Sequence, residues 1–594
     1  MLNSLDYPFD WAQIQRKSKQ IKRLLLAQDQ SWIEKKIAVL GGSTTFEVTK
    51  TLELFCLRRG IKPSFYESDF GLYYEDLMFG NPKLLSFKPD IIYFHTTSRN
   101  LKRLPQVTDS PAAVDEKLES ELHKIISLWD KAKELGCVVI QNNFELPYVR
   151  ALGNLDAVLP QGNTRFINLL NLKLADAIAA RKGVYLNDIH SLAARMGLTN
   201  WYSDELWRSY KYALRFQAIP DLANNLAAII AGLYGRSKKA LVLDLDDTLW
   251  GGVIGDDGVS GIRLGPDNPE GEGFVQFQKY LRQLRDRGIL LAVCSKNDFD
   301  IAKRAFTHPD SVLQFEDFAE FAANWGLKSE NIKNIAKSLN IGIDSLVYID
   351  DSAFERAEVR NQVKGLEAPE VTRNPVQTME AIDRSGFFEI SSLSSEDLQR
   401  NAMYSHEKKR DDFRASFASN EEFLRSLEMR ATIRPFESTY VDRITQLINK
   451  TNQFNLTAKR YTLEAVTQLM RETSSLHLWC RLEDRFGDNG LVAAIIGRGM
   501  NQHEIDLDVW VMSCRVFKRD VEFATFDHFI RRAKASGYQR VFGTYVPTAK
   551  NKIVEALLSD LKFTKRGKTA DGHIMYVFDI DEFSCPSYHI EVTT

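Results

Sequence analysis

The sequence is poor in cysteine and lacks any long apolar run. Its 594 residues include six cysteines, which is too few for a disulfide framework, and none of them shows the C-x-x-C spacing of a zinc site. No stretch approaches the roughly 18 apolar residues of a membrane span. The N-terminal segment MLNSLDYPFDWAQIQRKSKQ has no apolar core like that of a signal peptide. These absences predict a soluble, cytoplasmic protein that makes no use of a membrane.

The chain also lacks an excess of charge of either sign. Lys and Arg number 77 and Asp and Glu number 79, giving a net charge of −2. A protein whose main role is to bind nucleic acid is usually basic, so no nucleic-acid partner is expected. The hydrophobic fraction of 44% and the charged fraction of 26% are ordinary for globular proteins. At roughly 150 residues per domain, the length allows about four domains.

Hydrophobic patterning divides the chain into blocks. In the first block, 1–236, short apolar runs alternate with amphipathic stretches, as in a three-layer α/β domain. In the second, 237–388, apolar runs separated by helical segments predict a parallel sheet. A segment charged all round, 389–428, predicts helices that link domains or lie on a surface. The last block, 429–594, predicts a mostly antiparallel α/β domain.

The motif DLDDT follows an apolar strand in the second block. It places Asp244, Asp246 and Thr248 at the carboxyl edge of a parallel sheet, where ligands bind in open α/β folds. Clustered carboxylates favour a hard cation such as Mg²⁺. Asp350 and Asp351 end a second strand of this block.

Two further residues complete the pattern. Ser295 ends another strand of the same block, and Lys328 lies between these strands in NWGLKSEN. This set, in this order, resembles the haloacid-dehalogenase-like (HAD) phosphohydrolases.

The HAD resemblance implies a role for each motif. Asp244 would be the nucleophile and Asp246 the general acid and base. Asp244, Asp350 and the backbone carbonyl of Asp246 would bind Mg²⁺, with Asp351 close by. The phosphate-binding residues would be Thr248, Ser295, Lys296, Asn297 and Lys328.

The spacing of these motifs leaves no room for a large cap domain. Fewer than about 50 residues separate any two consecutive motifs, so the HAD-like domain is expected to be capless and open to a bulky or carrier-bound substrate. The insert WGGVIGDDGVSGIRLG predicts a glycine-rich, hairpin-like flap beside the site.

The runs LDLDDTLWGGVIGDDG, VCSKND and YIDDSAFERAEVR resemble the FkbH-like family more specifically. Such proteins carry an SGNH-like domain before the HAD domain and a GNAT-like domain after it. The resemblance implies loading of a glyceryl unit from 1,3-bisphosphoglycerate, a small phosphorylated three-carbon substrate, onto the phosphopantetheine arm of an acyl carrier protein. The products belong to polyketide and related biosynthesis.

The first block resembles SGNH esterases at LGGST, where Ser43 matches the nucleophile. The Asp-x-x-His motif of these enzymes is missing, because Asp204 is followed by Trp207. His190 has a different spacing. A serine without a base is a poor nucleophile, so this block is expected to be a degenerate hydrolase used for docking or binding. Ser43 could equally cap a helix.

The last block resembles GNAT domains at NKIVEALLSDLKF, but CRVFKRDVEF lacks the glycines of a pyrophosphate loop. Cys514 is the candidate thiol for the thioester, and the adjacent Arg515 is expected to favour a thiolate. The alternative for Cys514 is a buried core residue. Arg515, Lys518 and Arg519 could meet a phosphate or an acidic carrier.

Two polar runs add weaker candidates. The run 449–461 contains Asn452, Asn455 and Arg460, which could line a polar pocket, and Asp484 could orient a base. Solvated loops are the alternative for both.

Three functions stay open from the sequence. The first is a bifunctional phosphatase and acyltransferase, and the second is a plain HAD-type phosphatase with non-catalytic flanking domains. The third is a docking platform without catalysis, which the complete set of HAD motifs disfavours.

Overall fold

The computed structural model describes residues 2–28, 30, 32–548, 550–585 and 587–593. Two compact units are present: Met1–Ala231 with Thr462–Ala465, and Gly232–Tyr461 with Val466–Thr594. Three sheets confirm the expected α/β multidomain class. Among the described residues, no helix combines the length and apolar character that a bilayer crossing needs. The domain boundaries at 236, 388 and 428 stay predictions.

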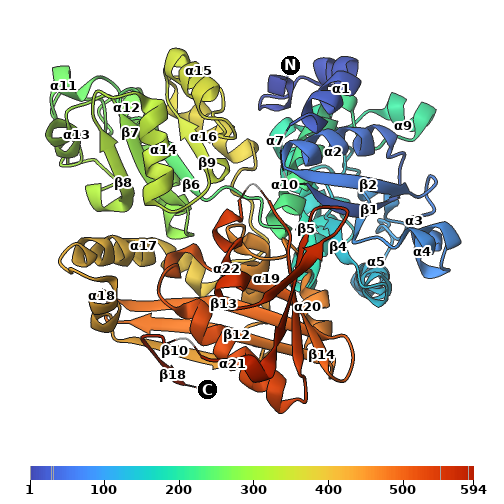
Figure 1. The fold of residues 1–594 in the computed structure, drawn as a ribbon. Coiled ribbons are helices and arrows are strands. Elements are labelled where there is room, and N and C mark those ends of the chain that lie inside the picture. Colours follow the sequence, from blue (N-terminus) through green and yellow to red (C-terminus); the bar gives the residue numbers. More distant parts are fainter. Residues whose placement is uncertain (1, 29, 31, 549, 586, 594) are drawn as a thin grey trace. The chain divides into compact units, whose positions relative to one another are not determined.

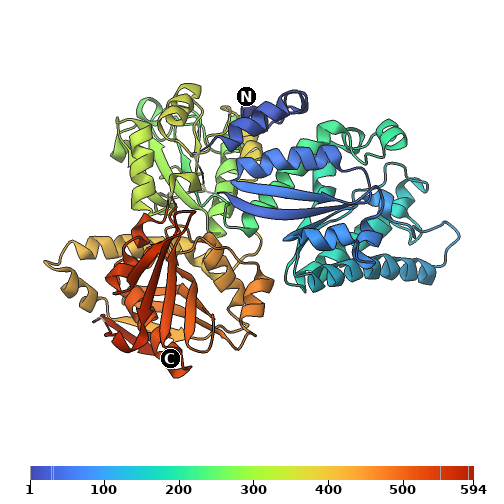
Figure 2. The ribbon, with the colours of Figure 1, turned by 45° about the vertical axis from the view of Figure 1, so that its right-hand side comes forward.

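The first unit is built on a parallel sheet with the strand order β2-β1-β3-β4-β5. Helices cover both of its faces, as the three-layer prediction requires (Figure 2). The strands are β1 (Ile33–Gly41), β2 (Ile61–Glu67), β3 (Ile91–His95), β4 (Val138–Asn142) and β5 (Val184–Asn187). The helices are α1 (Trp11–Leu26), α2 (Phe46–Arg58), α3 (Tyr73–Met78), α4 (Pro82–Phe87), α5 (Pro111–Glu134), α6 (Asn163–Ala179), α7 (Ile189–Met196), α8 (Leu198–Trp201), α9 (Asp204–Tyr210) and α10 (Ile219–Leu233).

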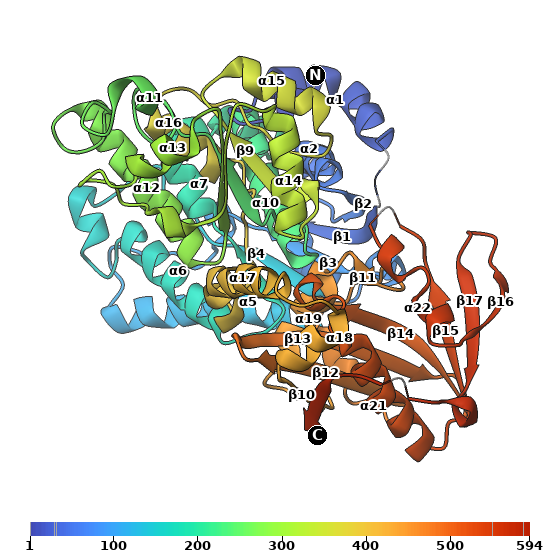
Figure 3. The same cartoon turned by 60° about the vertical axis from the view of Figure 1, so that its left-hand side comes forward.

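The second unit contains a four-stranded parallel sheet with the order β8-β7-β6-β9. The strands are β6 (Ala240–Leu243), β7 (Leu290–Ser295), β8 (Phe318–Ala323) and β9 (Leu346–Ile349). The helices are α11 (Ile254–Asp257), α12 (Pro269–Asp286), α13 (Phe299–Ala305), α14 (Lys328–Ser338), α15 (Ala353–Gln362) and α16 (Pro375–Arg384). Helix α14 packs on β7 and β8 (Figure 3). The fully buried strands β6, β7 and β9 match the three apolar runs.

The segment after β6 differs from the expected hairpin. A single antiparallel bridge joins Gly251 to Arg263, and the short helix α11 lies between them. The side chains of this segment bind its own backbone, since Asp257 accepts from Val253 N at 2.8 Å. Gly252 has a φ of 96°, which explains the glycine at this turn. Apart from this segment, only α12 separates β6 from β7, which leaves the site without a cap domain on this side.

The charged connector forms α17 (Ser395–Arg414) and α18 (Asn420–Ser426). Of the two predicted alternatives, a link between domains or a surface position, the contacts of α17 agree with the link, since Asp397, Met403 and Arg410 of this helix are buried. Helix α17 packs on β8 and α12 on one side and on β13 on the other (Figure 1). The buried charges are paired, which is why hydropathy alone gave no sign of them.

The rest of the second unit is a nine-stranded mixed sheet with the order β16-β17-β15-β14-β13-β12-β10-β18, to which β11 adds beside β14. The strands are β10 (Met429–Arg434), β11 (Phe454–Asn455), β12 (Ser475–Asp484), β13 (Gly487–Gly499), β14 (Glu504–Met512), β15 (Arg540–Tyr545), β16 (Thr564–Lys568), β17 (Ile574–Asp579) and β18 (Ile590–Thr593). The helices are α19 (Val441–Lys450), α20 (Leu463–Leu469), α21 (Val521–Ala535) and α22 (Leu557–Asp560).

The parallel strands β14 and β15 pair over four residues and then part. Their register runs from Glu504↔Arg540 to Leu507↔Gly543. Beyond this point Met512 of β14 pairs with Phe454 of β11 instead. The sheet therefore opens at the carboxyl end of β14, and Cys514 follows directly after this opening.

Candidate active site

The acidic motifs converge at the carboxyl edge of the four-stranded sheet. Asp244 follows β6, and Asp350 and Asp351 follow the neighbouring strand β9. Carboxylate oxygens of these three residues lie within 4.8 Å of one another. Ser295 ends β7 on the other side of β6, and its hydroxyl accepts a hydrogen bond from Asn297 Nδ2 at 3.3 Å. Parallel strands bring all of these ends to one edge, as predicted.

Lys328 joins the two central carboxylates. It is the first residue of α14 and is buried, and its Nζ lies 2.9 Å from Asp244 Oδ2 and 2.5 Å from Asp350 Oδ2. Although burial opposes its charge, these two carboxylates raise the pKa of the Lys328 ammonium above its usual value. Lys328 therefore stays charged at neutral pH, where it can offset the negative charge of a phosphoryl group.

Burial also changes the acidic side chains. It raises the pKa of Asp244 to about 6, and the Asp350 carboxylate adds to the rise, whereas Lys328 opposes it. Burial likewise raises the pKa of Asp351. The three carboxylates of this cluster repel one another, so a bound metal cation would stabilise their charged forms.

The donors present fit Mg²⁺. Oδ1 of Asp244 is buried and makes no hydrogen bond with any described residue. Asp350 and Asp351 supply further carboxylate oxygens within 4.8 Å. An all-oxygen set with an unsatisfied buried oxygen is what a hard divalent cation requires. Asp244, Asp350 and Asp351 would hold the ion. The predicted binding of Mg²⁺ by the backbone carbonyl of Asp246 stays a prediction.

Asp246 is held apart from the metal cluster. Its Oδ1 accepts hydrogen bonds from Trp250 Nε1 and Ile254 N, both at 3.0 Å, and its Oδ2 accepts one from Asn297 Nδ2 at 2.8 Å. Three donors fix the carboxyl group beside Asp244, in the place a general acid and base needs. The insert after β6 supplies two of these donors, which is a clear structural purpose for it.

The predicted phosphate-binding residues separate into two groups. Lys328 contacts Asp244 directly, and Ser295 ends the strand beside it and helps to lower the pKa of Asp244. Asn297 instead positions Asp246, and Lys296 is turned toward Glu355, with Nζ 2.6 Å from Oε1. Thr248 accepts a hydrogen bond from Asp351 N at 3.3 Å, which ties the loop after β6 to the loop after β9.

Several contributors were missed from the sequence. Tyr348 donates a hydrogen bond to Asp350, and Arg356 donates to the carbonyls of Asp350 and Asp351 at 2.6 and 2.9 Å. Arg373 reaches Asp351 Oδ2 at 3.2 Å. Arg356 lies one helical turn into α15, so its spacing after the acidic pair was a usable signal. Arg373 lies in a loop 22 residues away and gave none.

Cys514 lies just beyond the strand on which it was expected. It opens a 3₁₀ turn, Cys514–Val516, after β14. Its carbonyl accepts a hydrogen bond from Asn340 Nδ2 at 2.9 Å. Burial raises the pKa of the Cys514 thiol, while Lys239 and Arg515 oppose the rise. The pKa of Cys514 is therefore raised, whereas the expected activation would have lowered it. The resting thiol is protonated at neutral pH.

The basic run after Cys514 is not an exposed patch. Arg519 is buried, with its guanidinium 2.5 Å from Glu407 and 3.3 Å from Asp484. Arg515 donates to Ser513 Oγ at 3.3 Å and to the carbonyl of Asn489 at 3.4 Å. These arginines therefore hold the connector and the sheet together, and the expectation that Arg519 meets an acidic partner is not supported.

Asp484 belongs to the same buried network. Its carboxylate lies 2.8 Å from Arg410 Nε and also accepts hydrogen bonds from Phe486 N and Asn489 Nδ2. All of these contacts are internal, which indicates a structural part for Asp484.

The polar run before β12 is mostly self-contained. Asn455 is buried and accepts from Ala458 N at 2.9 Å. Arg460 donates to the carbonyl of Ile448 at 2.8 Å and to Asn452. Asn452 alone of the three predicted residues lines a pocket of this unit.

Ser43 lies in the loop between β1 and α2. It is buried, and its hydroxyl makes no hydrogen bond with any described residue. His190 binds the carbonyl of Phe144 at 3.1 Å, and Asp204 pairs with Arg99. Thr45, rather than Ser43, occupies the N-cap of α2. These contacts agree with a hydrolase-like unit without a working triad.

The sheet order, the carboxylate cluster and Lys328 define the class: an α/β protein with a HAD-like phosphohydrolase site. The family described as FkbH, N-terminal domain, matches residues 36–231. This match confirms the resemblance to the FkbH-like family for this part of the chain. No curated protein matches the sequence.

Two solved structures illustrate the likeness. The N-terminal part of the protein BF1531 from Bacteroides fragilis, described as containing a phosphatase domain complexed with Mg, is 28% identical, with a TM-score of 0.59 over 63% of this chain and 99% of that one. The ribosomal-protein-S18-alanine N-acetyltransferase from Escherichia coli is 16% identical, with a TM-score of 0.21 over 27% and 99%. The second likeness is too small to argue from.

Proposed function

We propose that the chain is a Mg²⁺-dependent phosphatase and acyltransferase. It converts 1,3-bisphosphoglycerate into a glyceryl thioester, through Cys514, on the phosphopantetheine arm of an acyl carrier protein. The observation that carries the phosphatase half is the cluster of Asp244, Asp350 and Asp351 beside Lys328. The BF1531 structure, described as a phosphatase domain with Mg, supports it.

The phosphatase step follows from the positions of Asp244 and Asp246. An oxygen of Asp244 attacks phosphorus while the bond to the ester oxygen breaks, and Asp246 gives its proton to that leaving oxygen. Asp246 then takes a proton from water, whose oxygen attacks phosphorus and frees Asp244 and inorganic phosphate. Lys328 and Ser295 bind the phosphoryl oxygens. A bound Mg²⁺ would offset the charge of the phosphoryl group against Asp244.

The transfer half depends on Cys514 and the opening beside β14. The sulfur attacks the acyl carbon of the acyl phosphate, the bond from that carbon to the phosphate oxygen breaks, and the departing phosphate takes the thiol proton, which leaves an acyl thioester and inorganic phosphate. A second thiol, that of the carrier arm, then displaces Cys514. The parting of β14 from β15 gives the acyl chain a place next to this turn.

A plain phosphatase with non-catalytic flanking domains is the second candidate. The raised pKa of Cys514 favours it, because a protonated thiol is a weak nucleophile. In this case phosphate is released without any thioester.

Intact-mass analysis with Mg²⁺ and 1,3-bisphosphoglycerate tests the proposal and separates the two candidates. We expect a glyceryl or phosphoglyceryl adduct on the wild-type chain and none on Cys514→Ala. Cys585→Ala is the matched control, because it removes an exposed cysteine and leaves Cys514 in place, and it should keep the adduct. Phosphate release without an adduct would leave the plain phosphatase.

A further inference from the structure

The pocket of the second unit that Asn452 lines is a cavity at the edge of the HAD-like sheet opposite to the carboxylates. Its volume is about 540 Å³, within the roughly 300–1,000 Å³ of small-molecule sites. Its walls include Lys239 before β6, Leu290 at the start of β7 and Ser345 before β9. The connector helix α17, helix α19 and the turn at Cys514 close it.

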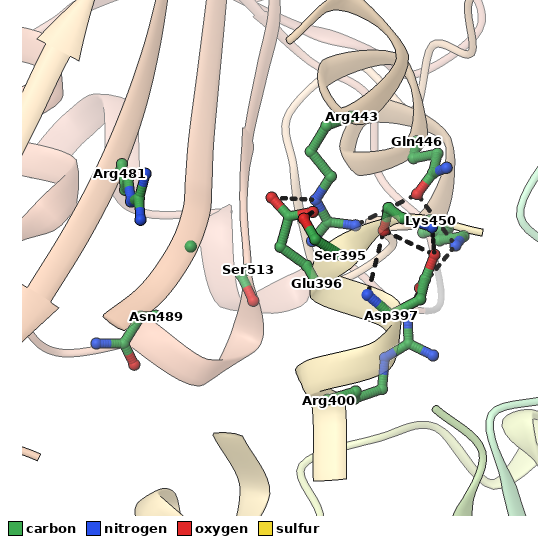
Figure 4. Close-up of polar contacts among 12 residues, drawn as sticks. Ser395, Glu396, Asp397, Arg400, Arg443, Gln446, Lys450, Arg481, Asn489 and Ser513 are labelled. Carbon is green, nitrogen blue, oxygen red and sulfur yellow. Dashed lines mark hydrogen bonds and ion pairs between the residues drawn. The ribbon is translucent and has the colours of Figure 1, made fainter. Parts of the chain in front are cut away.

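The cavity is strongly cationic. Nine of its lining residues are Lys or Arg, whereas three are Asp or Glu. The densest part is formed by Arg400 of α17 and by Arg443 and Lys450 of α19, which surround Asp397 (Figure 4). Lys450 Nζ lies 3.5 Å from Asp397 Oδ1, and Arg400 pairs with the same oxygen. One carboxylate thus serves two cations.

This cluster lacks enough negative charge of its own. Arg443 Nε lies 3.7 Å from Glu396 but makes no hydrogen bond with a described residue. Burial lowers the pKa of Arg443 to about 10 and that of Lys450 to about 8, and neighbouring cations add to both shifts. The Lys239 ammonium makes no hydrogen bond or ion pair within the described part of the chain. An anion that enters the cavity would stabilise all of these groups.

One part of the remaining wall is apolar and suits an uncharged body attached to that anion. Phe388, Leu447 and Phe517 line the cavity together with Cys514. A ligand with one anionic end and a narrow, mostly uncharged remainder would place its charge on the cationic cluster and its other end near the thiol.

We propose that this cavity binds a phosphate-bearing small molecule, with its phosphate held by Arg400, Arg443 and Lys450 and its other end directed toward Cys514. Arginine forks bind the oxygens of phosphate in pairs, which favours phosphate over a single carboxylate. Binding does not depend on the phosphatase. Only its consequence for acyl transfer rests on the proposed function of Cys514.

The two phosphate-binding sites are separate in space. Lys239 and Asp244 precede and follow the same strand, β6, and five residues of extended chain span roughly 16 Å. A small molecule in the cavity therefore cannot present its phosphate to Asp244. The phosphatase acts on a molecule bound at the other edge, either before it enters the cavity or after a carrier arm has taken the product away.

Alkylation of Cys514 by iodoacetamide, followed by peptide mass spectrometry of the full chain, tests the proposal. Inorganic phosphate, 3-phosphoglycerate and pantetheine 4′-phosphate are compared with chloride at equal ionic strength. We expect phosphate-bearing probes to slow the alkylation of Cys514 about tenfold and to leave the exposed Cys585 unaffected. Strongest protection by 3-phosphoglycerate identifies a free metabolite as the ligand, and strongest protection by pantetheine 4′-phosphate identifies a carrier arm.

Variants locate the effect. Lys450→Gln should need about tenfold more phosphate for the same protection, because a charged hydrogen-bond partner is lost. Lys408→Gln, an exposed position of the same α17 that does not line the cavity, is the matched control. Asp244→Asn should keep the protection while losing phosphatase activity, so the two proposals fail separately. The proposal is overturned if no probe protects wild-type Cys514, or if Asp244→Asn removes the protection.

Discussion

The two edges of the four-stranded sheet carry opposite chemistry. At the carboxyl edge, two of the three carboxylates share a single lysine, the third is paired with Arg373, and one carboxylate oxygen is left without a donor. At the amino edge, nine basic residues share three acidic ones, and one arginine nitrogen is left without an acceptor. Each edge therefore lacks the charge that the other has in excess. The first requires a cation and the second an anion, and the length of β6 keeps them apart.

This difference shows how one sheet can serve two reactions. Carboxylates follow strands in turns where backbone N–H groups and helix N-termini point outward, which favours negative charge. The densest group of cations at the other edge, Arg400, Arg443 and Lys450, comes from helices of the connector and the following domain, not from the sheet. The cavity thus exists only because α17 and α19 close over the strand starts.

The largest expected effect concerns Asp244. We expect Asp244→Asn to lower the rate of phosphate release about a thousandfold or more, because an amide cannot accept the phosphoryl group. Asp256→Asn, an exposed carboxylate of α11, is the matched control and should behave as wild type. Release of phosphate from a phosphate monoester is the measurement, and a rate within about tenfold of wild type would contradict the assignment.

Removal of divalent cations comes next. EDTA should abolish phosphate release, and added Mg²⁺ should restore it. Mg²⁺ that binds to the carboxylates should also raise the Tm of the wild-type chain, and that of the inactive Asp244→Glu variant, by about 3 °C. Differential scanning fluorimetry measures this shift. Asp350→Asn should remove this shift. A shift of equal size in Asp350→Asn would place the ion elsewhere.

The assignment of Asp484 predicts a change in stability rather than activity. Asp484→Ala leaves Arg410 and Arg519 buried with less negative charge, so we expect a loss of about 3 kcal/mol in the free energy of unfolding. Asp488→Ala breaks a half-exposed pair with Arg481 and should cost less than about 1 kcal/mol. Urea unfolding measures both, and a loss of transfer activity in folded Asp484→Ala protein would restore a catalytic part for this residue.

The smallest expected effect is a dependence of phosphate binding on pH. Because burial lowers the pKa of Lys450 to about 8, its ammonium is present below that pH and is lost above it. Protection of Cys514 by phosphate should therefore weaken severalfold between about pH 7.5 and 9. Arg443, whose pKa burial lowers to about 10, and Asp397, whose pKa Lys450 and Arg400 lower to about 2 against the effect of burial, keep their charge in this range. Lys239, whose pKa burial also lowers, changes in the same direction. Lys450→Gln should flatten the profile, and an unchanged profile would contradict the part given to this lysine.

Much of the carboxyl edge could be predicted from the sequence. Asp244, Ser295 and Asp350 each end a buried apolar run, and the parallel connections force such ends to one edge. The partners of these residues could not be predicted, because Asn297 binds Asp246 and Lys296 binds Glu355, and side-chain direction is not encoded in spacing.

The fold was predictable where strands are buried on both faces and less so elsewhere. The edge strand β2 contains Pro63 and is half exposed, and β8 has small residues with partial exposure, so neither gives a clear apolar run. The sequence gives no sign of the amino-edge cavity, because Arg400, Arg443 and Lys450 come together only when α17 and α19 pack in the folded chain. In the sequence they resemble the solvated charges of any amphipathic helix.

A crystal structure of the full chain grown with Mg²⁺ and inorganic phosphate is the most direct test of the separation between the two edges. We predict a Mg²⁺ ion bound by Asp244 and Asp350 at the carboxyl edge and a phosphate ion bound by Arg443 and Lys450 at the amino edge. A Mg²⁺ ion bound away from these carboxylates, or phosphate found at the carboxyl edge alone, would contradict the account.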